Sequence, residues 1–251
     1  MKNVTLIAVE SVFALLNILL YSSLSIASEQ AQSVQVALLF IFVLVSFKMK
    51  FGKVAHWLSV TLFLIALFSI VFVVPWPIPN VAVTVAFGFY LAKRRHQMFE
   101  MLPQFCSQKE ILIALLAAVV SISGVLLWYY LLKDPGDRPS FVLHYSLLIR
   151  ILIIVVFAIL NAYAEEFIYR GLVFDALSKK IRRMEFVNFL QAIAFGILHF
   201  RGIPSGVVGC FLAFIFAYLM GWLRIRSRGL FIPWLAHAIT DAGIAILVIT
   251  N

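Results

Sequence analysis

Charged residues are scarce in this chain. Only 12% of its 251 residues are Asp, Glu, Lys or Arg, whereas 64% are hydrophobic. Soluble globular domains carry about 25% charged residues, so this composition excludes an ordinary water-soluble fold. Apolar runs long enough to cross about 30 Å of hydrocarbon as helices recur from end to end. The sequence therefore predicts an all-α, polytopic integral membrane protein.

Cysteines and soluble segments are also scarce. The two cysteines, Cys106 in a predicted loop and Cys210 in a predicted span, indicate neither a disulfide nor a metal site. The sequence shows no internal repeat, and its longest loops, around 93–110 and 133–141, are too short to fold alone. We therefore expect a single integral membrane domain over residues 1–251.

Nine hydrophobic segments are candidate membrane-spanning helices. They cover residues 4–26, 33–47, 56–74, 80–92, 111–132, 142–178, 185–200, 205–223 and 230–250. The second and fourth are short, and the fourth could be re-entrant. Residues 25–27 resemble a signal-peptide cleavage site, but Glu10 and Ser11 interrupt the preceding apolar stretch, so we expect the first helix to be retained. Cleavage after Ala27 would leave eight spans.

Lysine and arginine residues indicate the orientation in the membrane. With the N-terminus in the cytoplasm, 15 of the 20 lie in predicted inner segments, and Arg150 and Arg170 lie within spans. The outer three are Lys133, Arg138 and Arg201. The net charge of +9 is then explained by an anionic inner leaflet, without nucleic acid as a partner. We expect a cytoplasmic N-terminus, and the compact loops favour a bacterial inner membrane.

Ionisable side chains within spans are costly in lipid, so each of them requires an explanation. Glu10, Arg150 and Asp175 lie near span ends or beside basic residues, where snorkelling or local ion pairing accounts for them. The remaining ones are Glu165, Glu166, Arg170, His199, His237 and Asp241. These six are the candidate functional residues.

Depth along the helices places four of these side chains in one layer. We counted 1.5 Å per residue from the cytoplasmic basic residue that anchors each helix. The depths are about 21, 24, 14 and 20 Å for Glu165, His199, His237 and Asp241. Three helices would thus bring two carboxylates and two imidazoles to one layer near mid-membrane, where they must face each other or water.

Spacing within the helices refines this arrangement. Glu166 and Arg170 are four residues apart and share a helix face, so they can form an ion pair. Glu165 points about 100° away and is free for another role. His237 and Asp241 repeat the spacing of four residues, which directs both side chains toward one pocket.

This set of groups permits hydrolysis. A carboxylate and an imidazole that hold one water can remove its proton, and a second imidazole with a neighbouring donor can stabilise the oxyanion formed at a carbonyl. Two histidines with two or three carboxylates are also an acceptable zinc ligand set, although the H-E-x-x-H signature is absent. The residues therefore predict activation of water with no required cofactor, and they leave zinc open.

Three short motifs occur in order on separate predicted helices. They are EEFIYR at 165–170, FGILH at 195–199 and HAITD at 237–241. They resemble the E-E-x-x-x-R, F-x-x-x-H and H-x-x-x-N/D motifs of the CPBP (Abi) family of intramembrane proteases, which includes the type II CAAX prenyl endopeptidase and bacteriocin-immunity proteins. The resemblance covers roughly residues 140–251, and the first half of the chain matches only as generic apolar helices.

The resemblance implies an intramembrane endopeptidase with catalytic helices at about 142–251. It implies four catalytic groups, which are Glu165, His199, His237 and Asp241. The first two would activate the water, the last two would form the oxyanion hole, and the Glu166–Arg170 pair would support the site. One position departs from the prenyl endopeptidases, which carry Asn where this chain has Asp241, because an ionised carboxylate cannot donate to an oxyanion. Either Asp241 is protonated or it orients His237.

Other functions stay open at this point. Acids and histidines near mid-membrane also fit a proton- or cation-coupled transporter, for which Pro75, Pro77 and Pro79 could mark a broken segment. A bacteriocin-immunity or scaffold protein without enzymatic activity is a further alternative. For a protease, the expected substrate is a membrane protein or a lipidated peptide, because the site lies within the bilayer.

Overall fold

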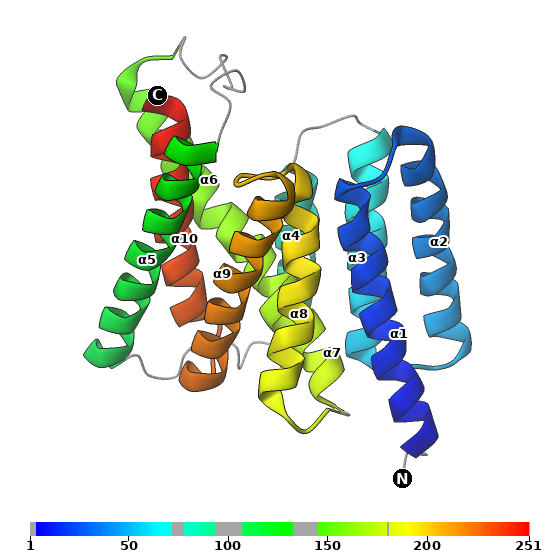
Figure 1. Cartoon of the computed structure of the whole chain (residues 1–251). Helices are drawn as coiled ribbons and strands as arrows, with labels where there is room; N and C mark the ends of the chain where they lie inside the picture. The colour runs from blue at the N-terminus through cyan, green and yellow to red at the C-terminus, as the bar shows by residue number, and fades with distance from the viewer. Residues whose placement is uncertain (1–3, 72–77, 94–106, 133–144, 180, 251) are drawn as a thin grey trace.

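The computed structural model describes residues 4–71, 78–93, 107–132, 145–179 and 181–250. These residues form a bundle of helices joined by short turns (Figure 1). The α-helices are α1 (Val4–Ser22), α2 (Glu29–Lys48), α3 (Lys53–Val71), α4 (Ile78–Lys93), α5 (Gln108–Leu132), α6 (Leu147–Glu166), α7 (Phe174–Ser178), α8 (Met184–Leu198), α9 (Gly206–Ser227) and α10 (Phe231–Thr250). The other helical pieces are the 3₁₀ turns η1 (Ser23–Ser25) and η5 (His199–Arg201) and the π-helical segment η4 (Phe167–Val173). The predicted all-α bundle is confirmed.

The helices have the length and composition of an integral membrane protein. Those long and apolar enough to cross a membrane cover Gln30–Lys48, Lys53–Val71, Gln108–Leu132, Leu147–Ser178 and Gly206–Ser227. Shorter apolar helices cover Val9–Ser25 and Phe231–Leu247. The remaining two predicted spans are α4, with 16 residues, and α8, with 15. Both are shorter than the roughly 20 residues of a full span, and both pack between neighbouring helices of the bundle.

Two helix ends differ from the predicted spans for local reasons. The α2 helix begins at Glu29 rather than at residue 33 because Ser28 caps it, with the Ala31 amide donating to the Ser28 hydroxyl at 3.4 Å. The α8 helix ends at Leu198, and His199 begins a 3₁₀ turn instead of continuing the span to residue 200. His199 therefore lies at a helix end, where its side chain is not constrained to one helix face.

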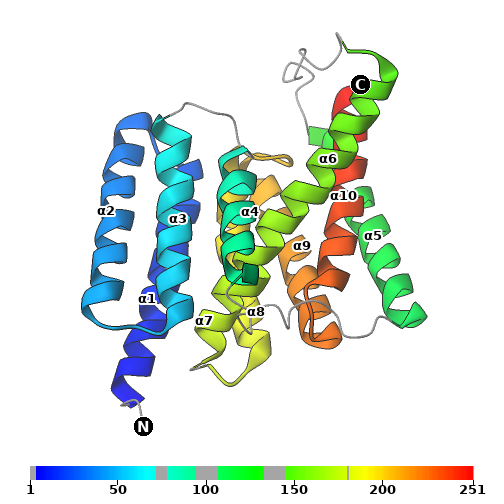
Figure 2. The ribbon, with the colours of Figure 1, turned by 180° about the vertical axis from the view of Figure 1, so that it is seen from behind.

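The helices are arranged with the motif-bearing ones in the middle. The helices α1, α2 and α3 form one flank of the bundle and α5 with α10 the other, with α8 and α9 between them (Figure 1). The view from behind shows α4 and α6 crossing the middle (Figure 2). Along this row, α8 packs on α9, and α10 packs on both α5 and α6. The C-terminal half of the chain thus surrounds the centre of the bundle.

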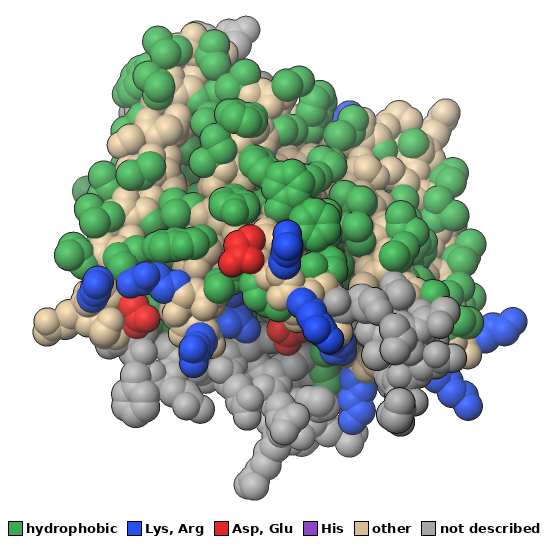
Figure 3. Space-filling model, turned by 60° about the horizontal axis from the view of Figure 1, so that its bottom comes forward, with side chains coloured by type: hydrophobic (Ala, Val, Ile, Leu, Met, Phe, Trp, Pro, Cys, Tyr) green, Lys and Arg blue, Asp and Glu red, His purple; other side chains and the backbone are tan. Residues whose placement is uncertain are grey.

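Basic residues gather at one end of the bundle. The turns between α2 and α3, α7 and α8, and α9 and α10 all lie at this end (Figures 1 and 2). They carry Lys48, Lys50, Lys53, Lys179, Arg182, Arg183, Arg224, Arg226 and Arg228. Figure 3 shows lysine and arginine side chains along this end, below a largely apolar wall. This is the end that the sequence predicts to be cytoplasmic.

Several sequence features lie outside the described residues. They are Lys2, Pro75, Pro77, Arg94, Arg95, Cys106, Lys133, Arg138 and Lys180. Of the three prolines considered for a broken transporter segment, Pro79 alone is described, and it lies in the first turn of α4. Proline is tolerated in the first turn of a helix because the amide hydrogen that it lacks has no partner within the helix there.

Glycines allow α8 and α9 to approach closely. A Cβ atom at Gly196 of α8 would lie 2.7 Å from the carbonyl oxygen of Cys210. A Cβ atom at Gly221 of α9 would overlap the side-chain oxygen of Asn188. Small residues at helix contacts are the usual means of close packing between membrane helices. This contact positions η5, and with it His199, next to the centre of the bundle.

Glu10 and Arg150, to which the sequence assigned structural roles, make local contacts. The amide of Gly52 donates to Glu10 Oε1 at 2.9 Å, and Arg150 Nε donates to the carbonyl oxygen of Tyr145 at 2.9 Å. Neither side chain therefore adds to the charged centre of the bundle.

Candidate active site

Three helices bring the motif residues to the middle of the bundle. Glu165 and Glu166 are the last two residues of α6, His199 follows α8, and His237 and Asp241 lie one turn apart on α10. Glu165, Glu166 and His237 are at most 2% exposed, and Asp241 is 8% exposed. So many ionisable side chains can be buried together only if they pair with one another.

The chain changes its helical geometry directly after the two glutamates. The π-helical segment η4 begins at Phe167, and all seven of its residues are buried. Such wide turns are rare and occur frequently at functional sites. The sequence predicted an uninterrupted span over 142–178, and spacing alone gave no sign of this change.

Glu166 is the centre of an ion-pair network. Its Oε1 accepts a hydrogen bond from Arg170 Nη1 at 2.9 Å and lies 2.7 Å from His237 Nδ1. Arg170, which is fully buried, also donates from Nη2 to the carbonyl oxygen of Ala217 at 2.9 Å. Its guanidinium lies over the Phe195 ring, 4.9 Å from the centroid. The predicted Glu166–Arg170 ion pair is confirmed, and it links η4 to α9.

His237 is oriented by this network. Since Glu166 is paired with Arg170, its carboxylate accepts, and His237 Nδ1 donates. The other ring nitrogen, Nε2, then faces Glu165 Oε2 at 3.6 Å and Asp241 Oδ1 at 3.5 Å. The imidazole is therefore held with Nε2 between two carboxylates from different helices.

Glu165 is held by longer contacts than Glu166. Asn161 Nδ2 lies 3.4 Å from Glu165 Oε1, and the same nitrogen donates to Asp241 Oδ2 at 3.0 Å. One amide, itself 6% exposed, thus bridges a carboxylate of α6 and a carboxylate of α10. The bridge fixes the distance between the two acids.

His199 lies beside the network without joining it. Its Nδ1 is 3.0 Å from the carbonyl oxygen of Phe195, and since a carbonyl only accepts, Nδ1 donates and Nε2 is left to accept from another molecule. The imidazole also stacks on the Phe195 ring, with 4.4 Å between centroids. Among the described residues, His199 makes no hydrogen bond with Glu165, its expected partner in activating water.

A cavity of about 200 Å³ connects the two histidines. His199, His237 and Asp241 line it, together with apolar side chains from α5, α9 and α10. Three of the four expected catalytic residues therefore face one space. Glu165 does not line this space, and its Oε2 lies 3.6 Å from Nε2 of His237, which does.

The donor atoms do not fit a zinc site. Within the described part of the chain, no group of three or more His, Cys, Asp or Glu side chains is arranged to hold a metal ion. His237 Nδ1 and Glu166 Oε1 bond to each other, and His199 Nδ1 bonds to the backbone. A zinc ion needs several free nitrogen, oxygen or sulfur atoms at about 2.0–2.3 Å from one point.

Sequence reasoning missed two contacts of this site. Asn161 precedes Glu165 by four residues, the same spacing that identified the Glu166–Arg170 pair, so a signal for it was present. The Arg170 contact with the Ala217 carbonyl oxygen has no sequence signal, because every residue carries a carbonyl group.

Comparison with known proteins finds a family match over the helices that carry the motifs. Residues 146–243 match a family model described as type II CAAX prenyl endopeptidase Rce1-like, and the match spans every motif residue from Glu165 to Asp241. No curated protein and no solved structure matches the chain. The match supports a protease of the general CAAX type, and the apolar helices support an integral membrane protein. The match over residues 146–243 is consistent with the resemblance to the CPBP family.

Proposed function

We propose that this protein is an intramembrane endopeptidase that hydrolyses peptide bonds with water activated by Glu165. The observation that supports this most strongly is the difference between the two adjacent glutamates. Glu166 is fixed at 2.9 Å by Arg170 and at 2.7 Å by His237, whereas Glu165 has contacts of 3.4 and 3.6 Å. A carboxylate with only long contacts is available to bind a water and take its proton.

The proposed reaction uses Glu165, beside the cavity, and the two histidines that line it. Glu165 takes a proton from the water, and the water oxygen attacks the carbonyl carbon of the scissile bond. His199 assists by accepting a hydrogen bond from the water at its Nε2. When the carbon–nitrogen bond breaks, Glu165 returns the proton to the leaving nitrogen, as general acid–base catalysis requires.

The developing oxyanion would lie on the His237 side of the cavity. For this His237 would be protonated on both ring nitrogens, so that Nε2 donates to the oxyanion while Nδ1 donates to Glu166 and holds the ring in position. Asp241 accepts a hydrogen bond from Asn161 and lies 3.5 Å from His237 Nε2. These contacts support the role of orienting His237, rather than donating to the oxyanion, for the aspartate at this position.

The proposed substrate is a membrane protein or a lipidated peptide. The catalytic groups are buried inside an apolar bundle, so a substrate that already lies in the bilayer reaches them without leaving the lipid. We also propose a cytoplasmic N-terminus in a bacterial inner membrane, because the basic residues gather at one end. The mechanism requires no metal ion or other cofactor.

Purified full-length protein and a complex mixture of peptides provide the test. Products identified by mass spectrometry should appear with the wild type and be absent with Glu165→Gln, which keeps the side-chain shape but is a far weaker base. Glu185→Gln, at an exposed acid in the first turn of α8, is the matched control and should cleave as the wild type does. Equal cleavage by Glu165→Gln would overturn the proposal, and cation flux in liposomes without cleavage would favour transport.

A further inference from the structure

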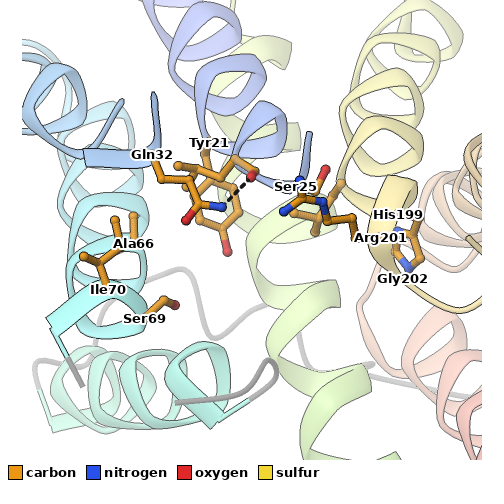
Figure 4. Close-up of a pocket in the computed structure, with 11 residues that line it drawn as sticks. Tyr21, Ser25, Gln32, Ala66, Ser69, Ile70, His199, Arg201 and Gly202 are labelled. Carbon is orange, nitrogen blue, oxygen red and sulfur yellow. Dashed lines mark hydrogen bonds between the residues drawn. The ribbon is translucent and has the colours of Figure 1, made fainter. Parts of the chain in front are cut away.

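A second pocket shares His199 with the cavity described above. It has a volume of about 260 Å³ and lies between the end of α1, the start of α2, the end of α3 and η5. We call it the α1–α3 pocket. Its polar lining side chains, besides His199, are Tyr21, Ser25, Gln32, Ser69 and Arg201 (Figure 4). Because His199 lines both spaces, a ligand that fills the α1–α3 pocket lies against one of the proposed catalytic side chains.

The neutral side chains of the α1–α3 pocket leave acceptors for a ligand. Ser25 Oγ and Ser69 Oγ donate to backbone carbonyl oxygens at 2.8 and 2.9 Å. Gln32 Nε2 donates to the carbonyl oxygen of Leu24 at 3.2 Å, the dashed line in Figure 4. With their hydrogens engaged, the hydroxyl oxygens offer lone pairs, which accept from N–H groups.

Arg201 supplies a positively charged hydrogen-bond donor at the same pocket. It is the only Asp, Glu, Lys or Arg among the lining residues. In the described residues it has no ion-pair partner. Figure 4 shows its side chain extending from beside Gly202 toward Ser25. The pocket therefore combines acceptor oxygens with one unpaired guanidinium, which matches a ligand with N–H groups and one anionic group.

We propose that the α1–α3 pocket binds the part of the substrate on one side of the scissile bond, and that this part is a peptide segment carrying a carboxylate. The backbone N–H groups of the segment meet the acceptor oxygens, and its carboxylate pairs with Arg201. The bond to be cleaved then lies near His199. The carboxylate comes from an acidic side chain or from a chain terminus. This inference rests on the proposed peptidase activity.

The test compares cleavage of peptides by purified full-length variants. Among peptides cut by the wild type from a complex mixture, those with a carboxylate within a few residues on one side of the cleaved bond should be enriched. For the best of them, Arg201→Gln should lower kcat/KM about ten- to a hundredfold, the effect of losing one charge-assisted hydrogen bond. Arg182→Gln, at an exposed arginine of the opposite end, is the matched control and should cleave as the wild type does.

Two analogues of the best peptide identify the source of the carboxylate. One carries a C-terminal amide, and the other carries Asn or Gln in place of the acidic side chain. The analogue that lacks the recognised carboxylate should be cut equally by the wild type and by Arg201→Gln. Ser69→Leu, which fills the pocket without changing its charge, should slow cleavage of the full peptide more than cleavage of a peptide shortened on that side.

Three results would count against the pocket. If Arg201→Gln lowers cleavage of all peptides equally, or of none, the carboxylate subsite is wrong. If Arg201→Gln instead abolishes binding of phosphatidylglycerol vesicles and leaves the cleavage pattern unchanged, the pocket is a lipid site and the proposal is overturned. If the wild type cuts no peptide at all, the proposed function fails first and this inference fails with it.

Discussion

Exchanging Asn161 and Asp241 tests how the two halves of the site are held together. In the wild type the amide of Asn161 donates to Asp241 at 3.0 Å. Asp241→Asn alone places two amides in contact and creates the asparagine typical of prenyl endopeptidases. Asn161→Asp alone brings a third carboxylate next to Glu165 and Asp241. The double exchange restores one contact between an amide and a carboxylate, in the reverse sense.

The size of each effect follows from burial. A buried acceptor that loses its donor costs about 1–3 kcal/mol, and both side chains are less than 9% exposed. Asn161→Asp adds repulsion between carboxylates, roughly 4 kcal/mol for two charges 4 Å apart at an effective dielectric constant of about 20. We therefore expect Asn161→Asp to be less stable than Asp241→Asn. The double exchange should be more stable than the sum of the single changes by several kcal/mol, because it restores the hydrogen bond and also removes the repulsion between the carboxylates at positions 161 and 241.

The assay is a double-mutant cycle on the apparent free energy of unfolding, measured with purified protein in detergent. Cleavage of one peptide, measured on the same four proteins, should show the same coupling, because the bridge positions Glu165. A second cycle that combines Asp241→Asn with Asn188→Asp, a buried amide on α8 that bonds within the α8–α9 contact, is the control and should show no coupling. Additive effects of Asn161→Asp and Asp241→Asn would refute the proposed bridge.

Three further predictions concern the supports of the site and its metal requirement. Arg170→Ala removes the guanidinium from the buried Glu166 and leaves that carboxylate with His237 as its remaining partner. Breaking this buried ion pair should lower stability by about 3–5 kcal/mol, seen as a lower melting temperature; equal yield and melting would contradict this. Gly221→Ala drives a methyl group into Asn188 and should cost about 1–3 kcal/mol, whereas Gly124→Ala, with nothing within 4 Å of its new Cβ, should melt as the wild type does. Cleavage should survive metal chelation by 1,10-phenanthroline, and loss of activity that zinc restores would show a metal requirement.

The helical bundle and most of the site could be predicted from the sequence because charges are conspicuous in apolar spans. Glu166 and Arg170 form the ion pair that their spacing indicates. His237 and Asp241 both line the cavity, as the spacing of four residues on one helix implies. These predictions depend on helix geometry, which is local and regular.

The position of His199 shows what the sequence could not supply. Depth along its helix placed it in the right layer, but the end of α8 at Leu198 allows its Nδ1 to bond with the Phe195 carbonyl oxygen. The α1–α3 pocket was also beyond prediction. Tyr21 and Ser25 are ordinary residues of the first span, and only the packing of α1 and α3 near η5 makes them line the same pocket as His199.

The most direct test of a peptidase is a comparison of protein termini in membranes of cells that carry the wild type or Glu165→Gln at equal expression. The account predicts new termini that are present only with the wild type and that lie in membrane-associated proteins. Identical termini in the two membranes, together with any phenotype that the Glu165→Gln variant retains, would contradict it.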